Sequence, residues 1–362
     1  MDKIIFFTTL IIFPFGQLFK IGFTNLFDVS VVLLAIITLL QKPKFPNWYK
    51  YFIYFVLFCV FSILFNYQFF EFKNVLYLFR LISYSLVAVF ISNHINSKDN
   101  LFKQLLGGQE IESKLLWLSI TAAVFGWIQY LIWLDLTALK YLGWDDHLLR
   151  MVGTFLDPTY LALIFILGII LAIKNNKTKA LLFLIFSLAF TYSRVSYLIL
   201  GLIFLFIKFD IKKKILLAIF FSLVVMFLPK NIGEGTTLTR TASGNNKLLN
   251  IEETIKIIRT SPLIGVGYNN ICSARQKYLS DINTNSHSCN GADSSILFLL
   301  ATTGVIGLIL FVSFLIKMPS SQYLVYSLGA VLIHSVFANS LFYPHVMFWI
   351  FALVGSETES DS

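Results

Sequence analysis

Long apolar segments, separated by short polar breaks, run through almost the whole chain. Because about 20 apolar residues in an α-helix cross the roughly 30 Å hydrocarbon core of a bilayer, such segments predict transmembrane helices. The predicted spans are at residues 4–19, 26–40, 51–66, 75–92, 115–134, 158–173, 180–192, 195–208, 215–228, 294–316, 322–338 and 345–355. We therefore expect an all-α polytopic membrane protein with about twelve transmembrane helices.

The charged breaks predict how these spans are oriented. Lysines concentrate in alternate connections, which face the cytoplasm by the positive-inside rule. Both termini are then cytoplasmic, and an outer loop is expected at residues 135–157. The chain divides into spans one to nine within residues 1–228, a large outer loop at 229–293, and spans ten to twelve with a cytoplasmic tail at 294–362.

Composition agrees with a membrane protein and narrows its partners. The 362 residues are 57% hydrophobic and 13% charged, with a mean hydropathy of +0.78. A soluble core of ordinary proportions cannot bury that much apolar surface. The formal net charge is +9, but much of it belongs to the lysines that set the topology. Membrane lipids are the expected surroundings, and nucleic acid is not implied.

The six arginines are placed differently from the lysines. None of them falls in a connection predicted to be cytoplasmic, although positive charge is needed there for orientation. Arginine presents a planar fork that binds phosphate or carboxylate through two parallel hydrogen bonds. Either this fork is needed at the outer face, or the placement reflects chance among six residues or contact with lipid headgroups.

Arg194 is the most informative of them. It lies midway along an apolar run at residues 180–207, which is too long for one span and just long enough for two short ones with an outward turn at Arg194. An arginine at membrane depth costs about 2.5 kcal/mol or more unless it is paired or lines a wet cavity. The residue therefore indicates either a functional site or a structural pair with a carboxylate such as Asp157.

Two aspartates stand directly before predicted spans. Asp157 precedes Pro158, and proline suits the first turn of a helix. Asp293 precedes the tenth span, and N-capping explains both positions. Asp293 is also a carboxylate at the predicted outer mouth of the bundle, close in sequence to His287. Either of these two residues could serve as a general base toward a sugar hydroxyl.

The large loop contains one helical pattern. Four apolar residues recur at helical spacing on one face between Lys247 and Thr260, and they are Leu248, Ile251, Ile255 and Ile258. Ser261 and Pro262 then stop the helix. We expect an interfacial helix that lies against the bundle, followed by a turn at Gly265 and Gly267.

The large loop also holds two of the three cysteines. Cys272 and Cys289 both lie there, and an oxidising outer compartment would allow them to pair. Cys59 lies inside a predicted span and is expected to be an inert packing residue. The sequence thus predicts a disulfide between Cys272 and Cys289.

A second polar cluster is predicted at the outer end of the eleventh span, where His334, Asn339 and Tyr343 suggest a lined cavity. Histidine in a bundle is more often a satisfied hydrogen-bonding residue than a catalyst. The sequence has no zinc spacing, Walker loop, dinucleotide fingerprint or nucleophile elbow. If the chain is an enzyme, we expect it to need no metal and no cofactor.

Four motifs occur in a fixed order along the chain. They are RMVGTFLDPTYLA at residues 150–162, YSR at 192–194, SPLIGVG at 261–267, and Asp293 followed by LFLLATTGVIG at 297–307. With the twelve predicted spans and the large late outer loop, this order resembles the bacterial O-antigen polymerase and ligase family over nearly the whole chain.

The resemblance implies a glycosyltransferase of the bacterial inner membrane that uses an undecaprenyl-diphosphate-linked oligosaccharide on the periplasmic side. Family arginines that hold the diphosphate correspond here to Arg150, Arg194 and Arg240. Fixed guanidinium groups stabilise charge on a diphosphate leaving group without a metal. The acceptor then attacks from the opposite side, with inversion at the anomeric carbon. The family also suggests a chain-length regulator as a partner.

One departure bears on the choice within the family. Ligases of this family carry a histidine-asparagine pair at the position of Asp293 and Ser294, and that histidine is the proposed base. Aspartate at this position favours a polymerase, which joins lipid-linked repeat units. The alternatives with the same chemistry are a ligase that transfers glycan to lipid A core and a capsule or exopolysaccharide polymerase.

A flippase or transporter of lipid-linked sugar is the alternative from another class. A transporter would be expected to show internal repeats and broken helices with polar groups near the midplane of both halves. The sequence shows no such repeat, and its polar residues concentrate on the side predicted to be outer. That asymmetry favours an enzyme.

Overall fold

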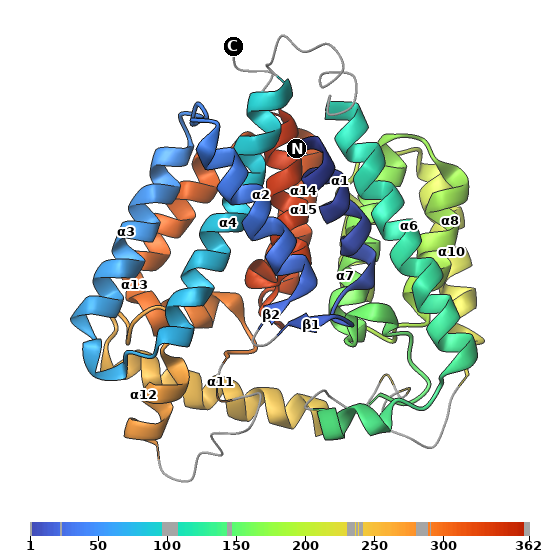
Figure 1. Cartoon of the computed structure of the whole chain (residues 1–362). Helices are drawn as coiled ribbons and strands as arrows, with labels where there is room; N and C mark the ends of the chain where they lie inside the picture. Colours follow the sequence, from blue (N-terminus) through green and yellow to red (C-terminus); the bar gives the residue numbers. More distant parts are fainter. Residues whose placement is uncertain are drawn as a thin grey trace. The chain divides into compact units, whose positions relative to one another are not determined.

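The computed structural model describes residues 2–21, 24–95, 108–142, 147–229, 236, 238, 242–279, 289 and 291–357. Within these residues the fold is helical, which confirms the all-α prediction (Figure 1). The described exception is a short antiparallel pair, β1 (Lys20–Ile21) and β2 (Thr24–Asn25), in which Lys20 lies opposite Asn25. The chain forms two compact units: Met1–Leu34, Asp99–Thr241 and Ser321–His334 make the first, and Ala35–Lys98, Ala242–Ser320 and Ser335–Ser362 make the second.

The first unit is built around helix α7 (Pro158–Lys174). Its residues from Leu161 to Ile173 are all buried, and α6, α8, α9 and α14 pack against it. A helix that is apolar on every side suits such a central position. The other described helices of this unit are α1 (Asp2–Ile12), η1 (Phe13–Phe15), α6 (Gly108–Ile132), η3 (Thr137–Leu142), η4 (Gly153–Phe155), α8 (Thr178–Ala189), α9 (Arg194–Phe206), α10 (Ile211–Met226) and α14 (Gln322–His334). Helix α2 (Leu26–Leu40) is divided between the two units.

The second unit is built around the packed pair α4 (Phe72–Ile95) and α15 (Pro344–Glu357). These two helices approach closely at Gly355, where an added Cβ would lie 2.6 Å from the carbonyl oxygen of Ala88. The other described helices are α3 (Tyr49–Phe65), η2 (Tyr67–Phe69), α11 (Ala242–Thr260), α12 (Ile271–Tyr278), α13 (Ser295–Lys317) and η7 (Ser340–Phe342). Helix α3 packs along α13, and α11 and α12 contact α13 at one end of the unit (Figure 1).

Each of the twelve predicted spans contains a described helix. Among the described residues, three helices are long and apolar enough to cross a membrane by length and composition, at Phe72–Ile95, Gln109–Ile132 and Ser295–Lys317. Shorter apolar helices are Leu26–Leu40, Tyr49–Phe65, Pro158–Lys174, Thr178–Ala189, Arg194–Phe206 and Gln322–His334. The number of helices that cross a membrane, and the side on which the long loop lies, remain predictions.

The first predicted span, residues 4–19, is shorter than expected. Helix α1 ends at Ile12, because Pro14 lies in the next turn and Gly16 takes a φ of 58°. An added Cβ at Gly16 would lie 2.4 Å from the carbonyl oxygen of Thr154. That oxygen accepts a hydrogen bond from the backbone N–H of Gln17 at 2.9 Å. Gly16 and Gln17, near the end of this span, therefore contact the backbone of η4 instead of continuing the helix.

The apolar run at residues 180–207 folds as two short helices, as its length predicts. Helix α8 ends at Ala189 and α9 begins at Arg194. Tyr192 turns the chain with a φ of 51°, and its hydroxyl donates to the carbonyl oxygen of Pro229 at 2.6 Å. The turn between the two helices therefore also holds the start of the long connection that follows α10.

The two aspartates before helices differ in their roles. Asp157 caps α7, because its Oδ1 accepts from the backbone N–H groups of Thr159 at 2.6 Å and Tyr160 at 3.4 Å. The predicted cap is thus confirmed. The cap predicted at Asp293 is wrong by one residue, since Ser294 Oγ accepts from the N–H of Leu297 at 3.5 Å. Ser294 has the extended backbone of an N-cap residue, with φ −131° and ψ 129°.

The SPLIGVG motif binds into a break in helix α13. The break lies at Gly304, whose φ of 65° and ψ of −169° are not helical. Residues 262–267, which we call the clasp segment, donate to the carbonyls of Ala301 and Thr302 from the N–H groups of Val266 and Gly267, at 2.9 and 3.0 Å. The N–H of Val305 in turn donates to the carbonyl of Pro262 at 2.9 Å. Backbone groups that the break would leave unpaired are therefore satisfied.

Glycine is required on both sides of this contact. A Cβ at Gly304 would lie 2.2 Å from the carbonyl oxygen of Leu263, and one at Gly265 would lie 2.4 Å from the carbonyl carbon of Thr302. Both glycines also have positive φ. The turn predicted at Gly265 and Gly267 is therefore present, and its purpose is backbone packing against α13.

The predicted helix at Lys247–Thr260 is present as part of α11, but its buried face is not the predicted one. Leu248 and Ile255 are exposed, whereas Asn250, Thr254 and Ile257 are buried. The reason is that a charged side chain from α12 occupies the buried side and requires polar partners there.

Candidate functional site

Arg150 is held in a closely packed segment of the first unit. The side chain is 7% exposed, and its Nε donates to the carbonyl oxygen of Thr191 at 3.0 Å. The next residue, Met151, donates its backbone N–H to the carbonyl of Phe190 at 2.9 Å. Arg150 therefore lies against the turn between α8 and α9, which leads into Arg194.

The segment after Arg150 is fixed by α6 and by the N-terminal region. Gln129 Oε1 accepts from the N–H groups of Val152 at 2.9 Å and Gly153 at 3.1 Å. Thr154 Oγ1 donates to the carbonyl of Pro14 at 2.6 Å. The RMVGTFLDP motif thus positions Arg150 at one end and the Asp157 cap of α7 at the other.

Arg194 is the first residue of α9 and is exposed. Its Nη1 donates to the carbonyl oxygen of Leu238 at 3.3 Å. The structure thus brings Arg150 and Arg194 to the same four-residue turn, one buried and one exposed. The third predicted diphosphate ligand, Arg240, lies outside the described residues, as does His287.

Asp293 lies in the second unit, where it is half-buried. Its backbone N–H donates to Asn250 Oδ1 at 2.9 Å, and Asn250 Nδ2 donates to the carbonyl of Gly291 at 3.3 Å. One asparagine on α11 therefore fixes the backbone on both sides of Ala292. This arrangement sets the direction in which the chain approaches α13.

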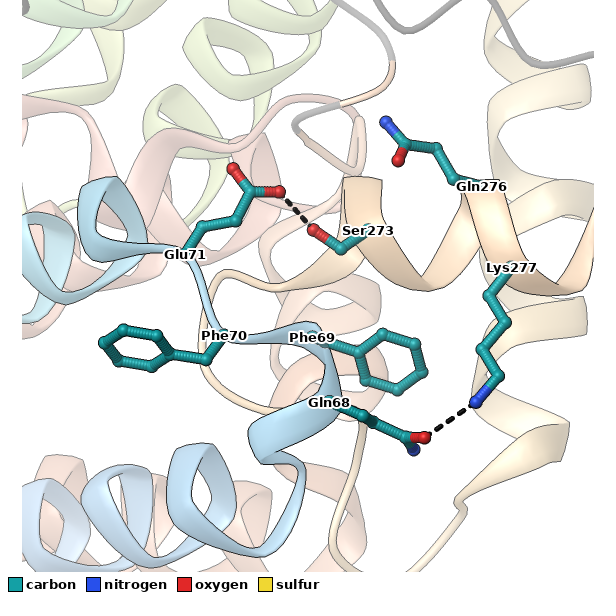
Figure 2. A pocket seen from close by; sticks show the side chains of 7 residues that line it. All are labelled: Gln68, Phe69, Phe70, Glu71, Ser273, Gln276 and Lys277. Atoms are coloured by element: carbon teal, nitrogen blue, oxygen red, sulfur yellow. Dashed lines mark hydrogen bonds between the residues drawn. The ribbon is translucent and has the colours of Figure 1, made fainter.

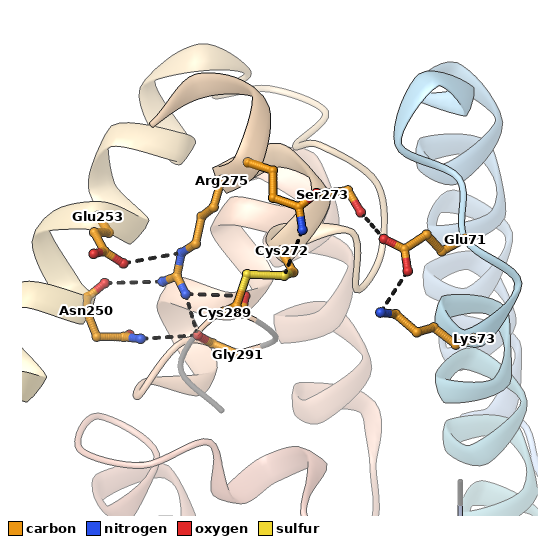
Figure 3. The surroundings of a disulfide bond; sticks show 10 residues. Glu71, Lys73, Asn250, Glu253, Cys272, Ser273, Arg275, Cys289 and Gly291 are labelled. Carbon is orange, nitrogen blue, oxygen red and sulfur yellow. Dashed lines mark hydrogen bonds and ion pairs between the residues drawn. A yellow bond between two sulfur atoms is a disulfide. The ribbon is translucent and has the colours of Figure 1, made fainter. Parts of the chain in front are cut away.

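Arg275 organises the same region from α12, as Figure 3 shows. Its side chain is 0% exposed and donates to Gly291 O at 3.1 Å, Cys289 O at 3.4 Å, Asn250 O at 3.4 Å and Thr254 Oγ1 at 2.8 Å. Burial lowers the pKa of this guanidinium below its usual value, while the Glu253 carboxylate and Asp293 oppose that change.

Arg275 therefore has a structural role. Its Nε lies 3.7 Å from Glu253 Oε2, and its Nη groups donate hydrogen bonds to carbonyl and hydroxyl oxygens. A buried charge with this many fixed partners joins α11, α12 and the residues before Asp293 into one body. Among the three arginines of the long loop, this one is not placed to receive a ligand.

Cys272 and Cys289 form a disulfide, with an S–S distance of 2.04 Å (Figure 3). Cys272 is in the first turn of α12, and Cys289 is one of the residues whose carbonyl accepts from Arg275. The covalent bond and the arginine therefore hold the same two segments together.

The predicted cavity residues are divided between the units. His334 ends α14 in the first unit and is buried. In the second unit, Asn339 Oδ1 accepts from Ser295 Oγ at 3.0 Å, and the Tyr343 ring lies 5.4 Å from the ring of His345. A cavity lined by His334, Asn339 and Tyr343 remains a prediction.

Sequence reasoning did not find Asn250, Thr254 or the role of Arg275. Asn250, Thr254 and Ile257 do recur at helical spacing, so a search for polar as well as apolar stripes would have marked this face. The partner on α12 has no local signal, because it becomes a neighbour only when the chain folds.

The comparisons with known proteins bear on the same part of the chain. No curated protein matches it. Residues 179–312 match the family model described as O-antigen ligase. The match includes the turn at Arg194, the clasp segment, Arg275 and Asp293, and it confirms the resemblance for this part of the chain. The motif at residues 150–162 lies outside the match. The comparison does not distinguish polymerases from ligases. Residues 179–312 of this membrane protein are therefore similar to the O-antigen ligase family.

Proposed function

We propose that the chain is an O-antigen polymerase of the bacterial inner membrane, which joins undecaprenyl-diphosphate-linked oligosaccharide repeat units at the periplasmic face. The observation that carries the proposal is the meeting of Arg150 and Arg194 at one turn of the first unit. Arginine side chains supply the charge and the fork geometry that a diphosphate needs. Arg240 is proposed as the third ligand of the same group.

The reaction is a displacement at the anomeric carbon. The bond between that carbon and the diphosphate oxygen breaks, and its electron pair leaves on the diphosphate, where the arginines stabilise the growing negative charge. The acceptor hydroxyl forms the new glycosidic bond from the opposite side, so the configuration inverts. Its proton goes to a general base.

Asp293 is the proposed base, with His287 as the other candidate. Helix capping does not account for Asp293, because Ser294 caps α13. The hydrogen bond from the Asp293 N–H to Asn250 fixes the backbone that carries the carboxylate. A fixed backbone is what a general base requires, since proton transfer depends on placement within hydrogen-bond reach.

A ligase is the second candidate, because the matching family model is described as O-antigen ligase. Asp293 in place of the family's histidine favours the polymerase. A capsule or exopolysaccharide polymerase would use the same residues. A flippase would also bind the diphosphate, but the sequence lacks the internal repeat expected of a transporter.

The test is deletion of the gene, followed by analysis of the lipopolysaccharide on a gel. If the chain is a polymerase, the deletion strain should carry lipid A core with a single repeat unit. Expression of the wild-type protein in that strain should restore the ladder. Core without any repeat indicates a ligase or flippase instead. A normal ladder in the deletion strain contradicts all three functions.

A further inference from the structure

An open pocket of about 390 Å³ lies in the second unit, and neither Arg275 nor Asp293 lines it (Figure 2). It lies between α12 and the connection from α3 to α4. Its lining residues are Gln68, Phe69, Phe70, Glu71, Ser273, Gln276 and Lys277. The volume falls in the range of about 300 to 1,000 Å³ that is usual for small-molecule sites.

One wall of the pocket is aromatic. The Phe69 ring packs edge-on against Tyr278, with ring centroids 5.8 Å apart. The Lys277 ammonium lies 5.3 Å from the Phe69 centroid and 5.7 Å from the Tyr278 centroid. Phe70 is 52% exposed. Its ring points to the opposite side of the connection from the buried Phe69 ring (Figure 2), and it is this exposed ring that offers an apolar face to a ligand.

The other wall is polar and offers both donors and acceptors. Lys277 Nζ donates to Gln68 Oε1 at 2.7 Å. Glu71 accepts from Ser273 Oγ, and its other carboxylate oxygen lies 2.8 Å from Lys73 Nζ. The hydrogen bond from Lys73 and then that from Ser273 lower the pKa of Glu71, which is therefore ionised at neutral pH. An ionised carboxylate on the wall disfavours phosphate as the ligand.

The pocket is preformed. Ser273, Gln276 and Lys277 belong to the helix that the Cys272–Cys289 disulfide and the buried Arg275 hold in place. Gln68 and Glu71 are fixed to that helix by the two hydrogen bonds just described. A site that needs little ordering binds its ligand with less loss of entropy.

We propose that this pocket binds one sugar ring of the glycan that the enzyme transfers or extends, and this inference rests on the function proposed above. A pyranose has an apolar C–H face, which packs on the exposed ring of Phe70. Its hydroxyls both donate and accept, which matches the carboxylate of Glu71, the amides of Gln68 and Gln276, and the ammonium of Lys277. The ring belongs either to the donor glycan or to the acceptor glycan.

The binding test uses full-length protein in lipid nanodiscs and saturation-transfer NMR. The probe is the free repeat-unit oligosaccharide, released from the host's polysaccharide by mild acid and lacking lipid and diphosphate. Phe70→Ala and Gln276→Ala are expected to weaken the Kd about three- to tenfold. Phe72→Ala is the matched control, because Phe72 is 71% exposed nearby but does not line the pocket.

An unchanged thermal midpoint, together with an intact Cys272–Cys289 bond in non-reducing mass analysis, shows that each variant is folded. The subsite is wrong if the wild type does not bind the free oligosaccharide. It is also wrong if Phe70→Ala binds as well as the wild type, or if Phe72→Ala loses as much affinity.

Steady-state transfer with reconstituted protein then identifies the source of the ring. A raised KM for the acceptor alone, with kcat unchanged, assigns the pocket to the acceptor glycan, and a raised KM for the donor alone assigns it to the donor glycan. Unchanged KM values for both contradict the proposal. If the wild type transfers no glycan at all, the proposed function fails, while the binding test still decides whether the pocket takes a sugar.

Discussion

Arg194 offers the sharpest single-residue test of the proposed diphosphate site. Arg194→Lys keeps the charge but loses the planar fork, so we expect kcat to fall by about a hundredfold. The measurement is transfer of lipid-linked glycan by the reconstituted protein. Arg259→Lys is the control, because Arg259 is an exposed arginine at the end of α11.

Full activity of Arg194→Lys would count against bidentate binding. An equal loss in Arg259→Lys would show that arginine in general, rather than this turn, is needed.

Glu71 makes a contribution to stability that depends on pH. Hydrogen bonds from Lys73 and Ser273 hold its pKa below the usual value. A carboxyl group with a lowered folded-state pKa stabilises the fold fully above its unfolded pKa of about 4.3, and this is lost as the pH falls through the lower folded-state value. The thermal midpoint of wild type should therefore exceed that of Glu71→Gln at neutral pH, and the difference should vanish in acid.

Thermal unfolding in detergent between neutral and acidic pH measures this difference. Ser273→Ala removes one of the two hydrogen-bond partners of Glu71. At neutral pH the thermal midpoint of Ser273→Ala should therefore lie closer to that of Glu71→Gln than the wild-type midpoint does. A difference that is the same at every pH would mean that the charge of Glu71 is irrelevant.

At the scale of elements, the clasp segment and the break in α13 depend on each other. Gly304→Ala places a Cβ 2.2 Å from the carbonyl of Leu263, at a φ that L-residues rarely adopt. We expect a loss of about 2 kcal/mol or more, because backbone cannot move away as a flexible side chain can. The measurement is the thermal midpoint of the detergent-solubilised protein.

Gly201→Ala is the control within a helix, since an added Cβ there meets nothing within 4 Å. It should leave the midpoint unchanged or raise it slightly. Equal midpoints for wild type and Gly304→Ala would show that the clasp segment does not fix the break.

The disulfide belongs to the same scale. Cys272 and Cys289 are separated by 17 residues, and closing a loop of about this size is worth about 3 kcal/mol in the chain-entropy model. The double variant Cys272→Ser, Cys289→Ser should be cleaved faster between α12 and Asp293 in limited proteolysis. Cys59→Ala is the control, because Cys59 is buried and outside the bond.

Reducing agent should make the wild type as susceptible as the double variant and should leave the variant unchanged. Equal cleavage rates in all of these samples would mean that Arg275 alone holds the segments together.

The sequence predicted where helices begin and turn better than it predicted which segments contact one another. The Asp157 cap and the turn before Arg194 could be predicted, because proline, capping residues and helix length act within a few positions. The buried face of α11 could not, because apolar periodicity selected Leu248 and Ile255 while Arg275 required Asn250 and Thr254. The place of the cap before α13 differed by one residue, since aspartate and serine are nearly equal as caps.

The site shows the same limit at the scale of the whole molecule. Arg194 was named from its residue type and its position in an apolar run, and Arg150 from the family resemblance. Their meeting at one turn depends on a contact between segments 41 residues apart. The network of Arg275 and the pocket beside α12 also join distant segments. Single-sequence patterns carry no information about such contacts.

The proposed mechanism predicts how the whole enzyme responds to metal removal. Because guanidinium groups supply the positive charge that the diphosphate leaving group needs, glycan transfer should persist in EDTA. The measurement is the initial rate of the reconstituted protein with and without chelator. Loss of activity in EDTA that Mg²⁺ or Mn²⁺ restores would contradict this mechanism.

The clasp segment also imposes an order on biosynthesis. Gly265 is made 39 residues before Gly304, so at about 5–20 residues per second its partner appears about two to eight seconds later. The helix that receives the clasp must be inserted before residues 262–267 can dock. During that interval the clasp segment lacks its backbone partners in α13.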